Sequence, residues 1–160
     1  LSKLNQLNEF ELHSIEQPIK ANQIQEMKLL CHQTPFPIAL DEELIGVFET
    51  EDKRKLLEEI QPQYIILKPS LVGGFKGTLE WISIAESLNI GWWITSALES
   101  NIGLNAITQF TFTLNNPMPQ GLGTGGLYTN NFDCPLQIEN GHIQYNVDKQ
   151  WGISNLGISI

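Results

Sequence analysis

Short apolar runs alternate with amphipathic stretches along most of the chain. The run Tyr64–Leu67 is uniformly apolar, which is typical of a parallel strand buried on both faces. In Thr78–Leu88 the apolar residues recur with a period of roughly 3.6, which predicts a helix with one buried face. Strands that alternate with helices predict βαβ units in a parallel sheet. The predicted strands are Glu11–Glu16, Pro37–Asp41, Tyr64–Lys68, Gly91–Ser96 and a weaker one at Gln120–Leu122, and the predicted helices are Asn22–His32, Glu51–Ile60, Thr78–Leu88 and Asn101–Phe112.

A polar residue closes each of the first four predicted strands at a regular interval. These residues are Glu16, Asp41, Lys68 and Thr95, with separations of 25, 27 and 27 residues (41 − 16, 68 − 41 and 95 − 68). One βα unit with two short loops has about that length, and a further step of about 26 residues reaches Gly121. In (β/α) barrels the catalytic groups lie at the carboxyl ends of the strands. The interval therefore favours a partial (β/α) barrel of the α/β class over an open doubly wound sheet.

The helical pattern stops after residue 127. Apolar residues of the segment 136–145 alternate on both sides of Asn140-Gly141, a pair that accepts the positive φ angles of a type I′ turn and predicts a β-hairpin. The last residues, Trp151–Ile160, are apolar enough to need a partner surface. We therefore predict a barrel portion over residues 1–132 and a hairpin with a tail over residues 133–160.

Charge and cysteine content narrow the classes of partner. Nine basic and eighteen acidic residues give a net charge of −9, which disfavours nucleic acid and anionic membranes but permits a small carboxylate substrate. No run of about 18 apolar residues, the length of a membrane-spanning helix, occurs. Cys31 and Cys134 are far apart and lack metal-ligand spacing. They are typical of reduced thiols in a cytoplasmic protein, with a disulfide as the less favoured interpretation.

Glu16 and Asp41 are candidate metal ligands. Both close neighbouring strands of the predicted barrel, so their carboxylates are expected in the same mouth. Oxygen ligands from adjacent strands suit Mg²⁺, which binds through few carboxylates and keeps positions open for substrate oxygens. The alternative interpretation is that each residue caps the following helix or meets solvent.

Lys68 and two glycine-rich segments are further candidates. Lys68 follows the most apolar strand and could stabilise an enediolate or move a proton, or it could extend to the surface. Gly73-Gly74 and Gly121–Gly126 follow predicted strands. Their backbone N–H groups could approach a carboxylate, or the glycines could serve only as turns.

Taken together, four segments resemble the enolase superfamily, and in particular its o-succinylbenzoate synthases. Ile15–Pro18 resembles the fourth-strand signature, Asp41–Leu44 the fifth-strand motif, and Leu67–Leu71 followed by Gly73-Gly74 the sixth-strand lysine motif. Thr95–Leu104 is similar to the seventh-strand segment of o-succinylbenzoate synthases. The resemblance implies strands four to eight of a TIM-like barrel.

The resemblance also implies an activity. It is the Mg²⁺-dependent syn dehydration of 2-succinyl-6-hydroxy-2,4-cyclohexadiene-1-carboxylate to o-succinylbenzoate in menaquinone biosynthesis, with Mn²⁺ as an alternative metal. Glu16 and Asp41 would hold the metal and Lys68 would be catalytic. The residues implied to contact the substrate are Thr95, Ser96, Gly121, Gly123 and Thr124, and those implied to support the site are Glu42 and Glu99.

The resemblance also implies that two parts of the superfamily's site belong to strands that come before Leu1. The family takes a third metal ligand, an aspartate, and a Lys-x-Lys motif from earlier strands. We therefore expect the N-terminal half of the same protein as a partner, and expect residues 1–160 alone to be inactive. Two alternatives stay open: a dipeptide epimerase or N-acylamino acid racemase of the same superfamily, and a non-catalytic binding or assembly module.

Overall fold

The structure, a computed structural model, describes residues 1–153. The chain forms two compact units, Leu1–Trp93 (unit 1) and Ile94–Ile160 (unit 2). The elements of unit 1 are α1 (Ser2–Leu7), the 3-10 helix η1 (Asn8–Phe10), β1 (Ile15–Glu16), α2 (Ile24–Gln33), β2 (Ile38–Leu40), the 3-10 helix η2 (Glu42–Leu44), α3 (Thr50–Ile60), β3 (Tyr64–Leu67), α4 (Gly74–Ser87) and β4 (Gly91–Ile94), whose last residue begins unit 2. Those of unit 2 are α5 (Asn101–Thr113), β5 (Leu136–Glu139) and β6 (His142–Tyr145).

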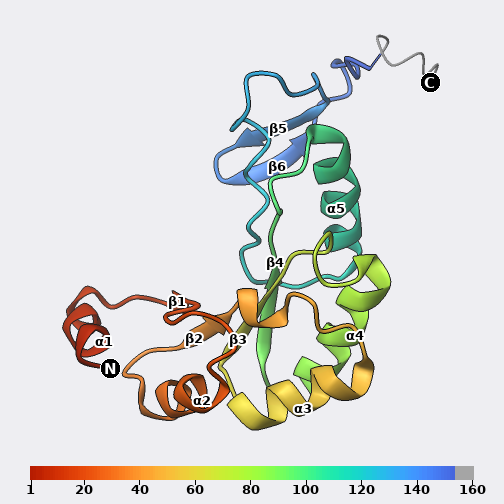
Figure 1. The fold of residues 1–160 in the computed structure, drawn as a ribbon. Coiled ribbons are helices and arrows are strands. Elements are labelled where there is room, and N and C mark those ends of the chain that lie inside the picture. Colours follow the sequence, from red (N-terminus) through yellow and green to blue (C-terminus); the bar gives the residue numbers. More distant parts are fainter. Residues whose placement is uncertain (154–160) are drawn as a thin grey trace. The chain divides into compact units, whose positions relative to one another are not determined.

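The sheet of unit 1 has its strands in chain order, β1-β2-β3-β4 (Figure 1). β1 pairs with β2 and β2 with β3 in parallel, with Glu16 opposite Ala39 and Ala39 opposite Tyr64. Helices α2, α3 and α4 follow the strands and pack in sequence, α2 on α3 and α3 on α4. Ile65 and Leu67 of β3 and Leu57 of α3 are completely buried. The predicted fold class, a partial parallel (β/α) arrangement, is confirmed.

Unit 2 contains the predicted hairpin. β5 and β6 pair antiparallel, with Glu139 opposite His142 across the turn. Asn140 and Gly141 have φ angles of 51° and 77°, the left-handed values that a type I′ turn requires. The weak strand predicted at Gln120–Leu122 is a single parallel bridge between Thr95 and Gly121.

Most predicted boundaries lie within one residue of the observed ones, but two predicted starts were wrong by four residues, for local reasons. The first strand is only Ile15–Glu16, because Glu11 has a left-handed φ of 49° and ends η1. Helix α4 begins at Gly74, four residues before the predicted start, because Gly73 turns the chain with a φ of 97°. Helix α1 was not predicted. Part of the apolar tail, residues 154–160, lies outside the described residues.

Two further observations concern the membrane and the thiols. Of the helices within residues 1–153, none is long and apolar enough to cross a membrane. Cys31 and Cys134 are free thiols, and burial raises the pKa of Cys31 to about 12. The boundary placed between residues 132 and 133 stays a prediction.

Candidate functional site

Three charged side chains meet at the carboxyl ends of β1, β2 and β3. Glu16 is the last residue of β1, and Asp41 and Lys68 directly follow β2 and β3. The Lys68 ammonium Nζ donates a hydrogen bond to Asp41 Oδ2 and forms an ion pair with it. The Asp41 side chain is 2% exposed and that of Lys68 is 20% exposed. The regular spacing in the sequence thus corresponds to a cluster in space.

Glu16 has a perturbed carboxyl group. Its partial burial, then a hydrogen bond to the Asp41 carboxyl group and the charge of Asp41, raise its pKa to about 7. The charge of Glu42 acts in the same direction, whereas Lys68 opposes it. Two carboxylates this close repel each other, so the pair favours either a shared proton or a nearby cation. The cluster is therefore suited to bind positive charge.

The donor set fits one Mg²⁺ ion. Mg²⁺ is bound through one or two carboxylates and retains waters or substrate oxygens at its other positions. Glu16 and Asp41 supply two carboxylates, and their mutual repulsion is what a divalent cation would offset. Within residues 1–153, no three His, Cys, Asp or Glu side chains form a group that could hold a metal. The described cluster thus offers two carboxylates to such an ion.

Three further residues lie next to the carboxylates: Glu42, for which a role was predicted, and Gln17 and Glu43, for which none was. Glu42, for which a supporting role was predicted, is exposed and acts on Glu16 through its charge. Glu43 is 6% exposed and accepts a hydrogen bond from the Gln17 side chain at 3.1 Å. Both Gln17 and Glu43 belong to the recognised motifs, but nothing in the residue pattern distinguished Glu43 from Glu42.

The predicted substrate residues of unit 2 form their own cluster. Thr95 Oγ1 donates to Gly121 O at 2.8 Å, and a Cβ added at Gly121 would lie 2.4 Å from that same Oγ1. Thr124 Oγ1 donates to Ser96 Oγ at 2.7 Å, and Ser96 is 4% exposed. Thr95 and Ser96 are thus tied to the glycine-rich loop. Gly123 lies against the hairpin, where an added Cβ would be 3.4 Å from Ile138 Cδ1.

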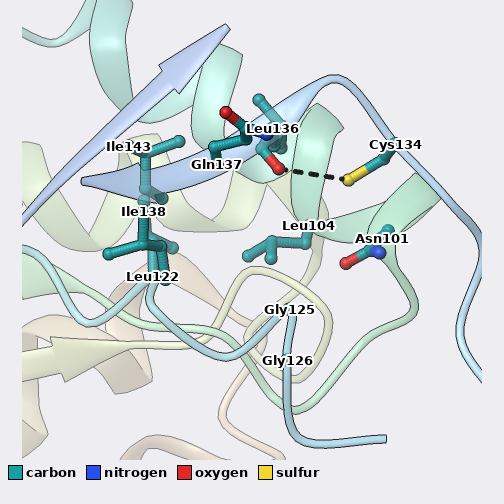
Figure 2. A pocket seen from close by; sticks show the side chains of 10 residues that line it. All are labelled: Asn101, Leu104, Leu122, Gly125, Gly126, Cys134, Leu136, Gln137, Ile138 and Ile143. Atoms are coloured by element: carbon teal, nitrogen blue, oxygen red, sulfur yellow. Dashed lines mark hydrogen bonds between the residues drawn. The ribbon is translucent and has the colours of Figure 1, made fainter. Parts of the chain in front are cut away.

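The same loop borders a hollow of about 320 Å³ in unit 2 (Figure 2). Its polar groups include Asn101 and Cys134, whose Sγ donates to Leu136 O at 3.6 Å. The lining residues are Asn101, Leu104, Leu122, Gly125, Gly126, Cys134, Leu136, Gln137, Ile138 and Ile143. None of the predicted substrate residues lines this hollow.

Glu99, predicted to support the site, precedes α5, and a Cβ added at Gly103 would lie 2.9 Å from Glu99 Cβ.

Comparison with curated proteins finds relatives that align with most of this chain. The chain is 55% identical over 139 residues to the o-succinylbenzoate synthase of Desulfotalea psychrophila, covering 87% of this chain and 38% of the relative. It is 33% identical over 103 residues to the N-succinylamino acid racemase of Thermus thermophilus, covering 64% of this chain and 27% of that protein. The chain thus spans less than half the length of these relatives.

Solved structures and a family model agree with these matches. The crystal structure of MenC from Desulfotalea psychrophila LSv54 superposes with a TM-score of 0.86 at 54% identity, over 89% of this chain and 40% of that one. A muconate lactonizing enzyme from Pseudomonas fluorescens, complexed with muconolactone, gives a TM-score of 0.80 at 29% identity, over 95% and 40%. The model of the enolase C-terminal domain-like family matches residues 1–154. The resemblance drawn from the four motifs is therefore confirmed, and the chain belongs to the enolase C-terminal domain-like family.

Proposed function

We propose that the gene product carrying this chain is an o-succinylbenzoate synthase. It would catalyse the Mg²⁺-dependent syn dehydration of 2-succinyl-6-hydroxy-2,4-cyclohexadiene-1-carboxylate in menaquinone biosynthesis. The observation that carries the proposal is the meeting of Glu16, Asp41 and Lys68 at the ends of three consecutive strands. The name of the Desulfotalea psychrophila relative, at 55% identity, supports this reaction over others of the family.

In this proposal Glu16 and Asp41 hold the metal, Mg²⁺ or alternatively Mn²⁺. When bound, the ion supplies Lewis acidity that stabilises negative charge on the substrate carboxylate. Asp41 is buried and fixed at the end of β2, whereas Glu16 is only partly buried and more accessible to solvent. A third carboxylate ligand and a second lysine would come from the N-terminal half of the same protein, as the resemblance implies. That half is the partner we propose for this chain.

Lys68 is the proposed catalytic residue. Its ammonium lies beside the Asp41 carboxylate and is partly exposed, so a bound substrate carboxylate can reach it. As the α-proton leaves, negative charge grows on that carboxylate, and a fixed ammonium stabilises this charge more than that of the ground state. The completely buried Leu67 fixes the backbone that precedes Lys68. Lys68 is thus a preorganised electrostatic group or a proton-transfer group.

We propose that the unit 2 cluster recognises the succinyl side chain. Thr95, Ser96 and Thr124 supply hydroxyl groups, and the absence of a side chain at Gly121 lets Thr95 pack directly against the glycine-rich loop. Gly123 of the same loop is the further residue that we assign to substrate binding. In this view Glu42 adds negative charge near Glu16, and Glu99 orients the start of α5. These assignments rest on the family resemblance together with the hydrogen bonds within unit 2.

A second candidate function is racemisation or epimerisation of N-acylamino acids or dipeptides. The observation in its favour is the identity to two such enzymes, 33% to the N-succinylamino acid racemase and 28% to the L-Ala-D/L-Glu epimerase of Thermotoga maritima. Both reactions begin by removing a proton next to a carboxylate, so the cluster of Glu16, Asp41 and Lys68 serves either. Specificity would then depend on unit 2.

The test assays the purified full-length gene product with the cyclohexadiene acid, N-succinylamino acids and L-Ala-L-Glu, each with Mg²⁺ and with EDTA. We expect o-succinylbenzoate to form at the highest kcat/KM, with loss of activity in EDTA and recovery on adding Mg²⁺. Asp41→Asn is the matched control, because it removes one ligand charge without changing size. Absence of dehydration by the folded, Mg²⁺-loaded protein would reject the proposal, and absence of all three reactions would favour a non-catalytic module.

A further inference from the structure

The side-chain amide of Gln17 joins the loops that follow β1 and β2. Its Oε1 accepts hydrogen bonds from the backbone N–H groups of Asp41 at 3.1 Å and Glu43 at 3.4 Å. Its Nε2 donates to Glu43 Oε2 at 3.1 Å and to the Ile19 carbonyl at 3.1 Å. An amide offers an acceptor and two donors in one planar group. Gln17 therefore connects the residue after Glu16 directly to the backbone of Asp41.

Glu43 completes this connection from the side of β2. Its carboxylate is buried, and its second oxygen, Oε1, accepts a hydrogen bond from the Asn22 backbone N–H at 2.8 Å. A buried carboxylate depends on such bonds, because leaving its oxygens without partners is costly. Glu43 thus holds both the Gln17 amide and the far end of the loop between β1 and α2.

The backbone at Gln17 is unusual for a residue with a side chain. Its φ of 35° lies in the left-handed region, which is sparsely populated outside glycine. Its N–H nevertheless continues the strand ladder and donates to the Ala39 carbonyl at 2.9 Å. The four hydrogen bonds of the side chain favour this conformation. The chain therefore changes direction immediately after Glu16 at a fixed point relative to β2.

From this geometry we propose that Gln17, clamped by Glu43, is a positioning residue that holds the Glu16 and Asp41 carboxylates at the separation needed to bind one divalent cation. The inference rests on the proposed function, in which those two residues are the metal ligands. The clamp acts against their repulsion, because the backbone of Asp41 is fixed to the residue that follows Glu16. Without it the two carboxylates move apart and the cation binds more weakly.

The opposite end of β2 provides a matched control. Gln63 also bridges two segments with its amide: Oε1 accepts from the Ile38 N–H at 2.9 Å, and Nε2 donates to the Cys31 carbonyl at 3.1 Å. Its partners are backbone groups of the first residue of β2 and of the last turn of α2, whereas Asp41 follows the other end of β2. Changing Gln63 to Glu therefore disturbs a bridge of the same chemistry without touching the proposed metal site.

The experiment measures Mn²⁺ affinity in the full-length gene product from the free Mn²⁺ signal in electron paramagnetic resonance, with thermal unfolding followed by circular dichroism. Gln17→Glu removes both donors and places a carboxylate against Glu43, so we expect about 10- to 100-fold weaker binding, as for other residues that orient metal ligands. The double variant Gln17→Glu/Glu43→Gln restores a donor–acceptor pair and should recover most of the affinity. Gln63→Glu should lower the unfolding temperature and leave the affinity unchanged.

Each outcome decides the proposal. Wild-type affinity in folded Gln17→Glu, an equal loss in Gln63→Glu, or a folded double variant without recovery overturns it. If Gln17→Glu does not fold, the comparison is between the double variant and Glu43→Gln alone, and the clamp requires tighter binding in the double variant. Asp41→Asn separates the two proposals. If this variant binds Mn²⁺ as tightly as wild type, both the assignment of the metal ligands and the positioning role of Gln17 are rejected. If Asp41→Asn abolishes Mn²⁺ binding while Gln17→Glu does not weaken it, only the positioning role of Gln17 is rejected.

Discussion

The ion pairs of Lys53 in the helix layer and of Lys68 at the end of the sheet differ in which partner is buried. In the helix layer Lys53 is 1% exposed and Glu80 is 27% exposed, with 2.7 Å between Lys53 Nζ and Glu80 Oε2. At the sheet end the carboxylate of Asp41 is 2% exposed and Lys68 is 20% exposed. The ammonium of Lys53 is therefore enclosed by protein, whereas that of Lys68 is accessible to solvent.

The surroundings of Lys53 show what this difference means. Its ammonium also donates to the Gly77 carbonyl at 3.4 Å and lies 5.7 Å from the centre of the Trp81 ring. These partners join α3 to α4 and leave the ammonium enclosed by protein groups. Burial and an ion pair alone therefore do not identify a catalytic lysine. Lys68, the proposed catalytic residue, differs in having an ammonium that a ligand can reach, next to carboxylates that repel each other.

The largest expected effect concerns Lys68. Lys68→Ala should lower kcat of the full-length gene product by about 10²–10³-fold with a smaller change in KM, because in the proposed mechanism the ammonium stabilises charge that develops in the transition state. Steady-state kinetics with the cyclohexadiene acid measures this, and circular dichroism checks the fold. Wild-type turnover in the folded variant would reject the catalytic role proposed for Lys68, and with it the functional difference between the two lysines.

Lys53→Ala should have the converse result. Removing the enclosed side chain leaves a cavity and a carboxylate that water can still reach, so we expect a loss of about 2–3 kcal/mol in the free energy of unfolding, near the lower end for large-to-small changes in cores. Urea unfolding measures the loss. The kcat of the folded variant should stay within about twofold of wild type, and a fall comparable to that of Lys68→Ala would show that the two pairs do not differ in role.

The pH dependence of stability tests the structural role of the ion pair between Lys53 and Glu80. The hydrogen bond from Lys53, assisted by the charges of Lys53 and Lys76, holds the pKa of Glu80 below its ordinary value of 4.5. The stability from the ionised form is therefore present above pH 4.5 and is lost as the pH falls through the lower folded value. Urea midpoints of wild type and Glu80→Gln should differ at pH 7 and converge below pH 4.5. A constant difference over that range would contradict this linkage.

The smallest effect is expected at Lys76. This lysine lies 3.9 Å from Glu80 and is 91% exposed, and exposed ion pairs of this kind contribute about 0–1 kcal/mol. Lys76→Ala should change the free energy of unfolding by less than about 0.5 kcal/mol. Urea unfolding in 0.5 M NaCl, where surface charges are screened, should remove even that difference. A loss equal to that of Lys53→Ala would mean that exposure does not separate these lysines.

Much of the sheet and of the charged cluster could be predicted from the sequence, because both depend on local pattern. The apolar run Tyr64–Leu67 requires burial on both faces, and the interval of 25 to 27 residues brings Glu16, Asp41 and Lys68 to the same edge of a parallel sheet. The type I′ turn at Asn140-Gly141 is equally local. These features need no information about how distant side chains pack.

The enclosed lysine and the amide clamp could not be predicted in this way. Lys53 lies within Glu51–Lys55, five consecutive charged residues that read as a solvated helix face. It is buried because α4 lies across it at Gly77, whose carbonyl accepts a hydrogen bond from Lys53 Nζ and where an added Cβ would lie 3.6 Å from that Nζ. Gln17 reaches the backbone of Asp41 because its own φ is left-handed. Both features depend on contacts between segments about 25 residues apart.

The strand order β1-β2-β3-β4 has a consequence for how the chain reaches this structure. Glu16 meets Ala39 after 23 residues, and Ala39 meets Tyr64 after 25. The loop that must close before each new strand pairs is therefore of nearly constant length, and its entropic cost does not grow as the sheet widens. Joining β1 directly to β4 would close a loop roughly three times longer, at about 1 kcal/mol more. Strand order thus favours assembly of the sheet one neighbour at a time, from either end.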